Sequence, residues 1–111
     1  MAENEVIDRV KFDMVIPEII RNEFKSRCSF QRVEMREVLE QLLRNYLVTP
    51  MGELGQLDPN RASPLVGFAC HIDRAVRNEF KSRCAIEQEP MWRVTARILQ
   101  EYLATLDQNI D

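Results

Sequence analysis

The octapeptide RNEFKSRC occupies residues 21–28 and recurs unchanged at residues 77–84, which is an offset of 56 residues. Carrying that offset outward without a gap aligns residues 10–47 with residues 66–103, and a direct count finds 16 identities in 38 aligned positions. Such a duplication indicates two copies of one structural unit. Each copy is shorter than the ~40 residues that usually fold alone without a staple. We therefore expect residues 1–111 to form one domain in which the two units share one core.

Composition excludes several classes of protein. The chain carries a net charge of −3 and is 45% hydrophobic, but no stretch approaches the ~18 apolar residues of a membrane span. Its N-terminus is acidic and lacks the apolar segment of a secretory signal. Three cysteines without a CxxC spacing are typical of free thiols in a reducing cytoplasm. With a single histidine and no phosphate-binding glycine loop, the sequence predicts no enzymatic activity, no cofactor and no metal site.

The first unit, residues 10–47, has the pattern of a strand followed by two helices. Residues 10–16 alternate with period two, which indicates a half-buried strand whose inward positions are Val10, Phe12, Met14 and Ile16. Pro17 ends that strand and suits the first turn of a helix. In residues 17–30, Ile20, Phe24 and Cys28 recur every four residues on one helical face. Residues 34–47 carry a longer apolar stripe and predict a second amphipathic helix.

The second unit, residues 66–103, repeats this scheme. Its inward strand positions are Val66, Phe68, Cys70 and Ile72, and its first helix presents Val76, Phe80 and Cys84. Residues 48–65 hold two of the three glycines and three of the five prolines, so they are expected to be a linker. Residues 104–111 are expected to be an acidic tail. Each unit has a charge of +1, and the negative charge lies in the termini and the linker.

The segments FDMVIPEIIRNEFKSRCSFQRVEMREVLEQLLRNYL and FACHIDRAVRNEFKSRCAIEQEPMWRVTARILQEYL resemble the ribbon–helix–helix family of Arc-, MetJ- and CopG-type repressors. The resemblance covers both units without insertions. It implies a mostly α-helical fold with a short two-stranded antiparallel ribbon, one strand coming from each unit. Because both copies lie on one chain, it implies a single-chain pseudo-dimer that acts as a cytoplasmic transcription regulator, a repressor in that family.

In that family, outward-facing ribbon side chains contact bases in the major groove of double-stranded DNA. The matching positions here are Lys11, Asp13, Val15, Gly67, Ala69 and His71. Lys11 has the donor for guanine, Asp13 the acceptor for the cytosine amino group, and His71 either function. Val15 and Ala69 suit contact with a thymine methyl group. All three equivalent pairs differ between the units, so the two copies either read a non-palindromic site or have lost a DNA-binding face.

The resemblance also implies phosphate contacts at the start of each second helix, where backbone amides and the helix dipole favour anions. The implied positions are Arg32, Met35, Arg36, Met91, Trp92 and Arg93. Glu34, Glu87 and Glu89 would place negative charge close to these phosphates. They motivate an alternative, in which the fold serves as an antitoxin-like or adaptor module for protein partners.

Several features of the sequence admit more than one interpretation. The identical octapeptides form either a shared binding surface or a core pair, Phe24/Phe80 and Cys28/Cys84, whose polar neighbours face solvent. Trp92 lies outside the apolar stripe, which favours contact with DNA, with a protein partner or with the linker. Self-association of pseudo-dimers is a further expectation, because a single ribbon buries little surface. No membrane partner is expected.

Overall fold

The computed structural model describes residues 8–49, 54–59 and 64–108, and in this part of the chain the order of elements is strand, helix, helix, twice over. Strand β1 (Arg9–Pro17) leads directly into helix α1 (Glu18–Gln31), which is followed by α2 (Met35–Leu47). Strand β2 (Leu65–Asp73) leads directly into α3 (Arg74–Glu87), which is followed by α4 (Met91–Gln108). The predicted strands and helices are therefore confirmed to within two residues, except at the end of α4.

The two strands pair antiparallel along their whole length, and the register is centred on Asp13 opposite Ala69. These two residues are 56 positions apart, the same offset that separates the octapeptides. Alternation along each strand places one set of side chains inward, and Phe12, Ile16, Phe68, Cys70 and Ile72 are all buried. The opposite face of the ribbon points away from the core.

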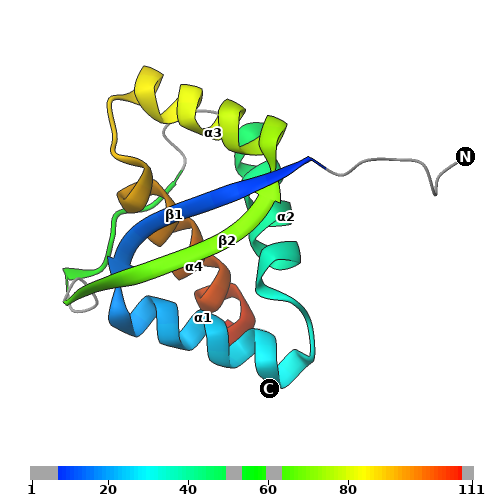
Figure 1. Ribbon diagram of the computed structural model, residues 1–111. Helices are drawn as coiled ribbons and strands as arrows, with labels where there is room; N and C mark the ends of the chain where they lie inside the picture. Colours follow the sequence, from blue (N-terminus) through cyan, green and yellow to red (C-terminus); the bar gives the residue numbers. More distant parts are fainter. Residues whose placement is uncertain (1–7, 50–53, 60–63, 109–111) are drawn as a thin grey trace, which may run out of the picture.

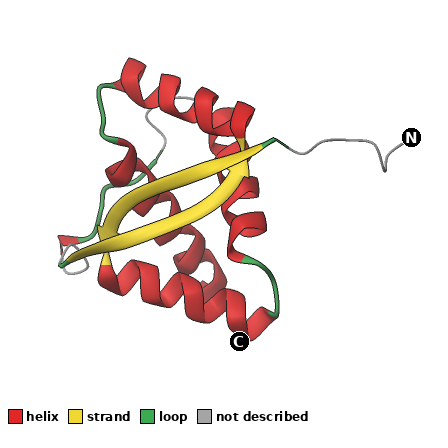
Figure 2. Cartoon of the chain, in the orientation of Figure 1, coloured by secondary structure: helices red, strands yellow, loops and turns green. Residues whose placement is uncertain are grey.

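The ribbon lies across the front of the helices in Figure 1, with α1 along one side and α3 along the other. Helices α2 and α4 lie behind the strands, so they cover only the inward face of the ribbon. In Figure 2, no described helix covers the outward face of the yellow ribbon. The molecule therefore presents one open sheet face, as an antiparallel sheet commonly does.

The two octapeptide phenylalanines hold the units together. Phe80 packs edge-on against Phe12 and Tyr46 of the first unit, with ring centroids 5.8 Å away in each case. Phe24 makes the corresponding contacts with Phe68 at 6.2 Å and Tyr102 at 6.0 Å in the second unit. Both phenylalanines have no exposed surface. Each unit thus fills the core of the other, which is the joint core that the duplication predicted.

The turns between consecutive helices use left-handed residues that are not glycine. Arg32 and Gln88 cap α1 and α3 with φ angles of 60° and 58°. Beyond each of them, the amides of Val33 and Glu89 donate to the carbonyls of Cys28 and Cys84 at 3.0 Å. This is the hydrogen-bond pattern of a Schellman cap, which satisfies the last carbonyls of each helix.

The segments outside the repeat are more structured than their composition suggests. Residues 54–59 run beside α4, where the Gly55 amide donates to Glu101 and Arg97 donates to the carbonyls of Leu54 and Gly55. Leu54 packs against the core. Helix α4 continues to Gln108, so residues 104–108, expected in the acidic tail, are helical. Parts of the expected linker and tail, residues 50–53, 60–63 and 109–111, lie outside the described residues.

Candidate nucleic-acid interface

The six ribbon positions singled out from the sequence share the outward face of the sheet, and all six are exposed. The register pairs them as Lys11 with His71, Asp13 with Ala69, and Val15 with Gly67. The six residues therefore form one continuous face, which we call the ribbon face. The major groove of DNA is wide enough to admit an antiparallel two-stranded ribbon.

The ribbon face is polar at one end and apolar at the other. Lys11 and His71 face each other across the strands, and the next outward pair at this end is Arg9 with Asp73. At the other end Val15 and Leu65 are each 44% exposed, and a β-carbon at Gly67 would point into open space. Because the strands are antiparallel, the two side chains able to donate hydrogen bonds to bases meet at the same end, although they come from different repeat positions.

Lys11 is held only weakly on this face. Its Nζ lies 3.8 Å from the Asp13 carboxylate, and both side chains are about 60% exposed. Exposed ion pairs of this kind contribute about 0–1 kcal/mol. The ammonium group can therefore leave Asp13 for a base or a phosphate at little cost.

Arg21 is a residue near the ribbon that the sequence interpretation missed. Its guanidinium donates to the Gly67 carbonyl at 3.3 Å, so helix α1 brings a cation to the apolar end of the ribbon face. It also contacts the Asn22 side chain. The octapeptide marked Arg21 as repeated, but only the register of the distant strand places it beside Gly67.

The starts of α2 and α4 lie on opposite sides of the ribbon in Figure 1. The first backbone hydrogen bonds of α2 are donated by the amides of Glu37 and Val38 to the Glu34 carbonyl. The first backbone hydrogen bonds of α4 are donated by the amides of Arg93 and Val94 to the Pro90 carbonyl. The amides expected to contact phosphates, at Met35, Arg36, Met91 and Trp92, thus precede the hydrogen-bond ladder of their helices. Two anion-favouring helix ends therefore flank the ribbon.

The arginines at these helix ends already have carboxylate partners. Arg36 Nε lies 2.9 Å from Glu34, which is the N-cap of α2 but makes no side-chain capping bond. Arg93 lies 3.7 Å from Glu89. Arg32 is exposed at the left-handed cap of α1. A phosphate at either site would compete with these acids for the guanidinium groups.

Trp92 does not protrude from the surface as its place outside the apolar stripe suggested. It is half-buried and packs against the core, as do Met35 and Met91. The Arg93 guanidinium lies 5.5 Å from the centre of the Trp92 ring. Trp92 therefore supports the start of α4, and its side chain stays partly exposed beside Arg93.

Arg83 corrects the expectation that the polar octapeptide residues face solvent. Its side chain is 11% exposed and binds Glu87 at 2.9 Å, the Tyr46 carbonyl at 2.7 Å and the Thr49 carbonyl at 2.6 Å. The Tyr46 hydroxyl donates to the same Glu87 carboxylate. Burial opposes ionisation of Glu87, but the hydrogen bonds from Tyr46 and Arg83 outweigh it and lower its pKa. Glu87 is thus a tie between α3 and α2 rather than a free charge near a phosphate.

The three cysteines are unpaired and buried. Burial, with a smaller contribution from Cys28, raises the pKa of Cys70 to about 11. Burial followed by the nearby Glu87 raises the pKa of Cys84 to about 12. Such thiols stay protonated at neutral pH and act as small core side chains. As predicted, Cys70 points inward while His71 points outward.

Comparisons of the chain with protein-family models, with curated proteins and with solved structures find no match. Across residues 8–49, 54–59 and 64–108, none of the helices combines the length and the apolar character needed to span a lipid bilayer. The functional inference therefore rests on the ribbon face and the helix ends beside it.

Proposed function

We propose that this protein is a sequence-specific DNA-binding transcription regulator, acting as a repressor, that inserts its ribbon face into the major groove of double-stranded DNA. The observation that carries the proposal is the open ribbon face, with six exposed residues on one surface and the helix ends of α2 and α4 on either side. A ribbon with an anion-favouring helix end on either side suits base contacts in a groove whose two edges are lined by phosphates. The proposal includes a cytoplasmic location, which the three unpaired thiols favour.

The proposed architecture is a single-chain ribbon–helix–helix pseudo-dimer. Three features support this architecture. The first is that the strand register is centred on Asp13 and Ala69, which occupy the same repeat position. Phe24 and Phe80 make equivalent aromatic contacts, each with the other unit. The left-handed caps Arg32 and Gln88 also occupy one repeat position.

The polarity of the ribbon face points to a non-palindromic DNA site. Lys11 and His71 at one end suit hydrogen bonds to purine edges, with guanine the best partner for lysine. At the other end, Val15 suits contact with thymine methyl groups. Because each half of the face presents different chemistry, the two half-sites are expected to differ in sequence.

Binding of a labelled mixed-sequence duplex across a salt series tests this function. The logarithm of the binding constant should fall linearly with the logarithm of the salt concentration, by about 0.9 per phosphate neutralised. Lys11→Gln should weaken binding more than Lys25→Gln, which removes the same charge from helix α1. Binding that does not respond to salt, or equal effects of the two variants, would contradict the proposal.

A second candidate function is a protein-interaction module, antitoxin-like or adaptor in kind, on the same fold. The observation that favours it is the pairing of Arg36 and Arg93 with glutamates at the helix ends. In this case the exposed part of Trp92 would contact the partner. Loss of a captured partner on Trp92→Ala, in a chain that binds no duplex at low salt, would support this function over the first.

A further inference from the structure

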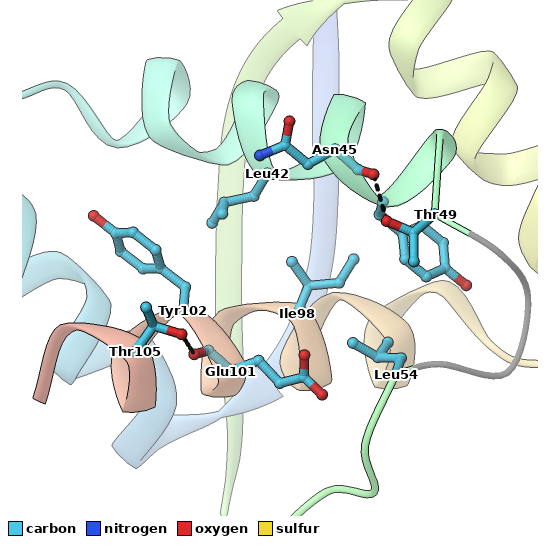
Figure 3. Close-up of a pocket in the computed structure, with 9 residues that line it drawn as sticks. Leu42, Asn45, Thr49, Leu54, Ile98, Glu101, Tyr102 and Thr105 are labelled. Atoms are coloured by element: carbon cyan, nitrogen blue, oxygen red, sulfur yellow. Dashed lines mark hydrogen bonds between the residues drawn. The ribbon is translucent and has the colours of Figure 1, made fainter. Parts of the chain in front are cut away.

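A pocket of about 370 Å³ lies between α2 and α4, on the side of the molecule opposite the ribbon face. The strands lie in front of these helices in Figure 1 and behind them in Figure 3. The volume falls in the range of small-molecule sites, which is about 300–1,000 Å³. DNA bound to the ribbon face would leave this pocket open.

The two repeat units contribute equivalent residues to the lining. The equivalent pairs are Leu42 with Ile98, Asn45 with Glu101, Tyr46 with Tyr102, and Thr49 with Thr105. Leu54 completes the lining. In Figure 3, Leu42 and Ile98 point toward each other, and the two threonines lie at opposite ends. The pair Asn45 and Glu101 alone differs in charge, so the pocket carries one carboxylate on one side.

The wall of the pocket next to that carboxylate is fixed by hydrogen bonds. Glu101 Oε2 accepts from the Gly55 amide at 2.5 Å. Arg97, one turn earlier in α4, donates to the Leu54 carbonyl at 2.9 Å and the Gly55 carbonyl at 2.6 Å. These bonds hold the Leu54 side chain beside Glu101, which places an apolar surface next to a negative charge.

Both threonine hydroxyls of the pocket donate to backbone carbonyls of their own helices. The Thr49 hydroxyl donates to the Asn45 carbonyl at 2.7 Å, and the Thr105 hydroxyl donates to the Glu101 carbonyl at 2.9 Å. Each hydroxyl has therefore used its one proton and retains acceptor capacity. The other carboxylate oxygen of Glu101 adds a charged acceptor. None of the nine lining residues is Lys, Arg or His.

We propose that this pocket binds a small organic cation, namely a primary ammonium or guanidinium group on a short apolar chain. The cationic head would bind the Glu101 carboxylate, and the chain would lie between Leu42, Leu54 and Ile98. Charge-assisted hydrogen bonds to a carboxylate are the stronger kind, and the lining offers a carboxylate anion no cationic partner. This inference does not depend on DNA binding.

Titration of the full chain with n-hexylamine at neutral pH tests the site, with methyl signals of Leu42, Leu54 and Ile98 observed by NMR. Saturable shifts of these methyls are expected with hexylammonium, and hexanoate at the same concentrations should cause none. Equal saturation by hexanoate, or no saturable shift with either compound, would overturn the proposal.

Glu101→Gln separates charge from structure. The glutamine oxygen can still accept from the Gly55 amide, so the Leu54 wall should remain, while hexylammonium affinity should fall by up to about fivefold, because the ammonium loses a charged partner that is exposed to solvent. Glu37→Gln removes an exposed carboxylate from the start of α2 and should leave the affinity unchanged.

Leu42→Phe should fill the pocket and abolish saturable binding. Unchanged affinity in Glu101→Gln or in Leu42→Phe would overturn the assignment.

Discussion

Lys11 lies directly across the ribbon from His71, although the two residues occupy different positions of the internal repeat. The repeat equivalent of Lys11 is Gly67, and that of His71 is Val15. Divergence of the two copies has therefore placed the two side chains of the ribbon face that can donate hydrogen bonds at one end of the ribbon and left the other end apolar.

The first prediction concerns this polarity. Lys11→Ala and His71→Ala should weaken contacts with the same half of a bound DNA site, because the two residues are cross-strand neighbours. A good base contact is worth about 1–3 kcal/mol, so each change should reduce affinity by about tenfold to a hundredfold. Val15→Ala should instead relax discrimination in the opposite half. Titrations against duplexes substituted one base pair at a time measure this, and effects spread evenly over both halves would disagree with it.

Removing the charge of Glu34 should strengthen DNA binding. Glu34 pairs with Arg36 at 2.9 Å and makes no side-chain capping bond, so Glu34→Gln removes the nearer of the two carboxylates beside this guanidinium and leaves only Glu37 at 3.8 Å. The salt dependence should become steeper by up to about 0.9, the value for one additional phosphate. Glu101→Gln removes the same charge on the side opposite the ribbon and serves as the control. A Glu34→Gln protein that binds DNA no better than this control would show that Arg36 does not reach a phosphate.

Phe24→Ala and Phe80→Ala should each lower the free energy of unfolding by about 3–5 kcal/mol, because each ring is fully buried between the two units. The matched control is Phe30→Ala in the same helix as Phe24. Phe30 is 86% exposed, so its removal should change stability by about 0.5 kcal/mol or less. Urea unfolding monitored by circular dichroism provides the measurement. Similar losses for Phe24 and Phe30 would be inconsistent with the joint core.

Neither half of the chain should fold alone. Residues 1–53 lack the Phe68 and Tyr102 rings against which Phe24 packs, and residues 54–111 lack Phe12 and Tyr46. Each fragment should be unfolded or self-associated by circular dichroism and sedimentation, whereas an equimolar mixture should recover helical structure. A fragment that unfolds cooperatively as a monomer would refute the shared core.

The Glu87 tie predicts a specific acid sensitivity. Because hydrogen bonds from Tyr46 and Arg83 lower the pKa of Glu87 below its ordinary value of 4.5, its stabilising effect is complete above that pH. The effect is lost as the pH falls through the lower folded value. Glu87→Gln should cost about 1.5–3 kcal/mol at neutral pH and should flatten the loss of stability on acidification. Thermal melts from pH 7 to pH 3 measure both.

The control for this change is Glu37→Gln, whose carboxylate is 60% exposed and lies 3.8 Å from Arg36. It should alter stability by about 0.5 kcal/mol or less at neutral pH. If Glu87→Gln and Glu37→Gln show the same stability and the same pH profile, the buried tie does not contribute to the fold.

Local patterns were enough to predict much of the fold. Alternation identified both strands and their inward residues, and four-residue spacing identified Phe24, Cys28, Phe80 and Cys84 as core. The pairing of Lys11 with His71 was not accessible in this way. It depends on the register between strands 56 residues apart, which no local pattern specifies.

Other features depend on partners that a sequence does not reveal. Arg27 and Arg83 are the same residue of the octapeptide, but Glu87 stands where the first unit has Gln31, so the Arg83–Glu87 ion pair is specific to the second copy. Leu54 lies among turn-forming residues, and only the packing of residues 54–59 against α4 shows its place in the core. The pocket likewise arises from the meeting of α2 and α4.

Selection of binding sites from a random duplex pool at low salt, followed by titration of the selected sites across a salt series with the native chain and Lys11→Ala, tests the proposed function most directly. The proposal predicts an enriched, asymmetric motif whose binding weakens with salt and with the loss of Lys11. Absence of enrichment, with no binding even at low salt, would contradict a DNA-binding role for the ribbon face.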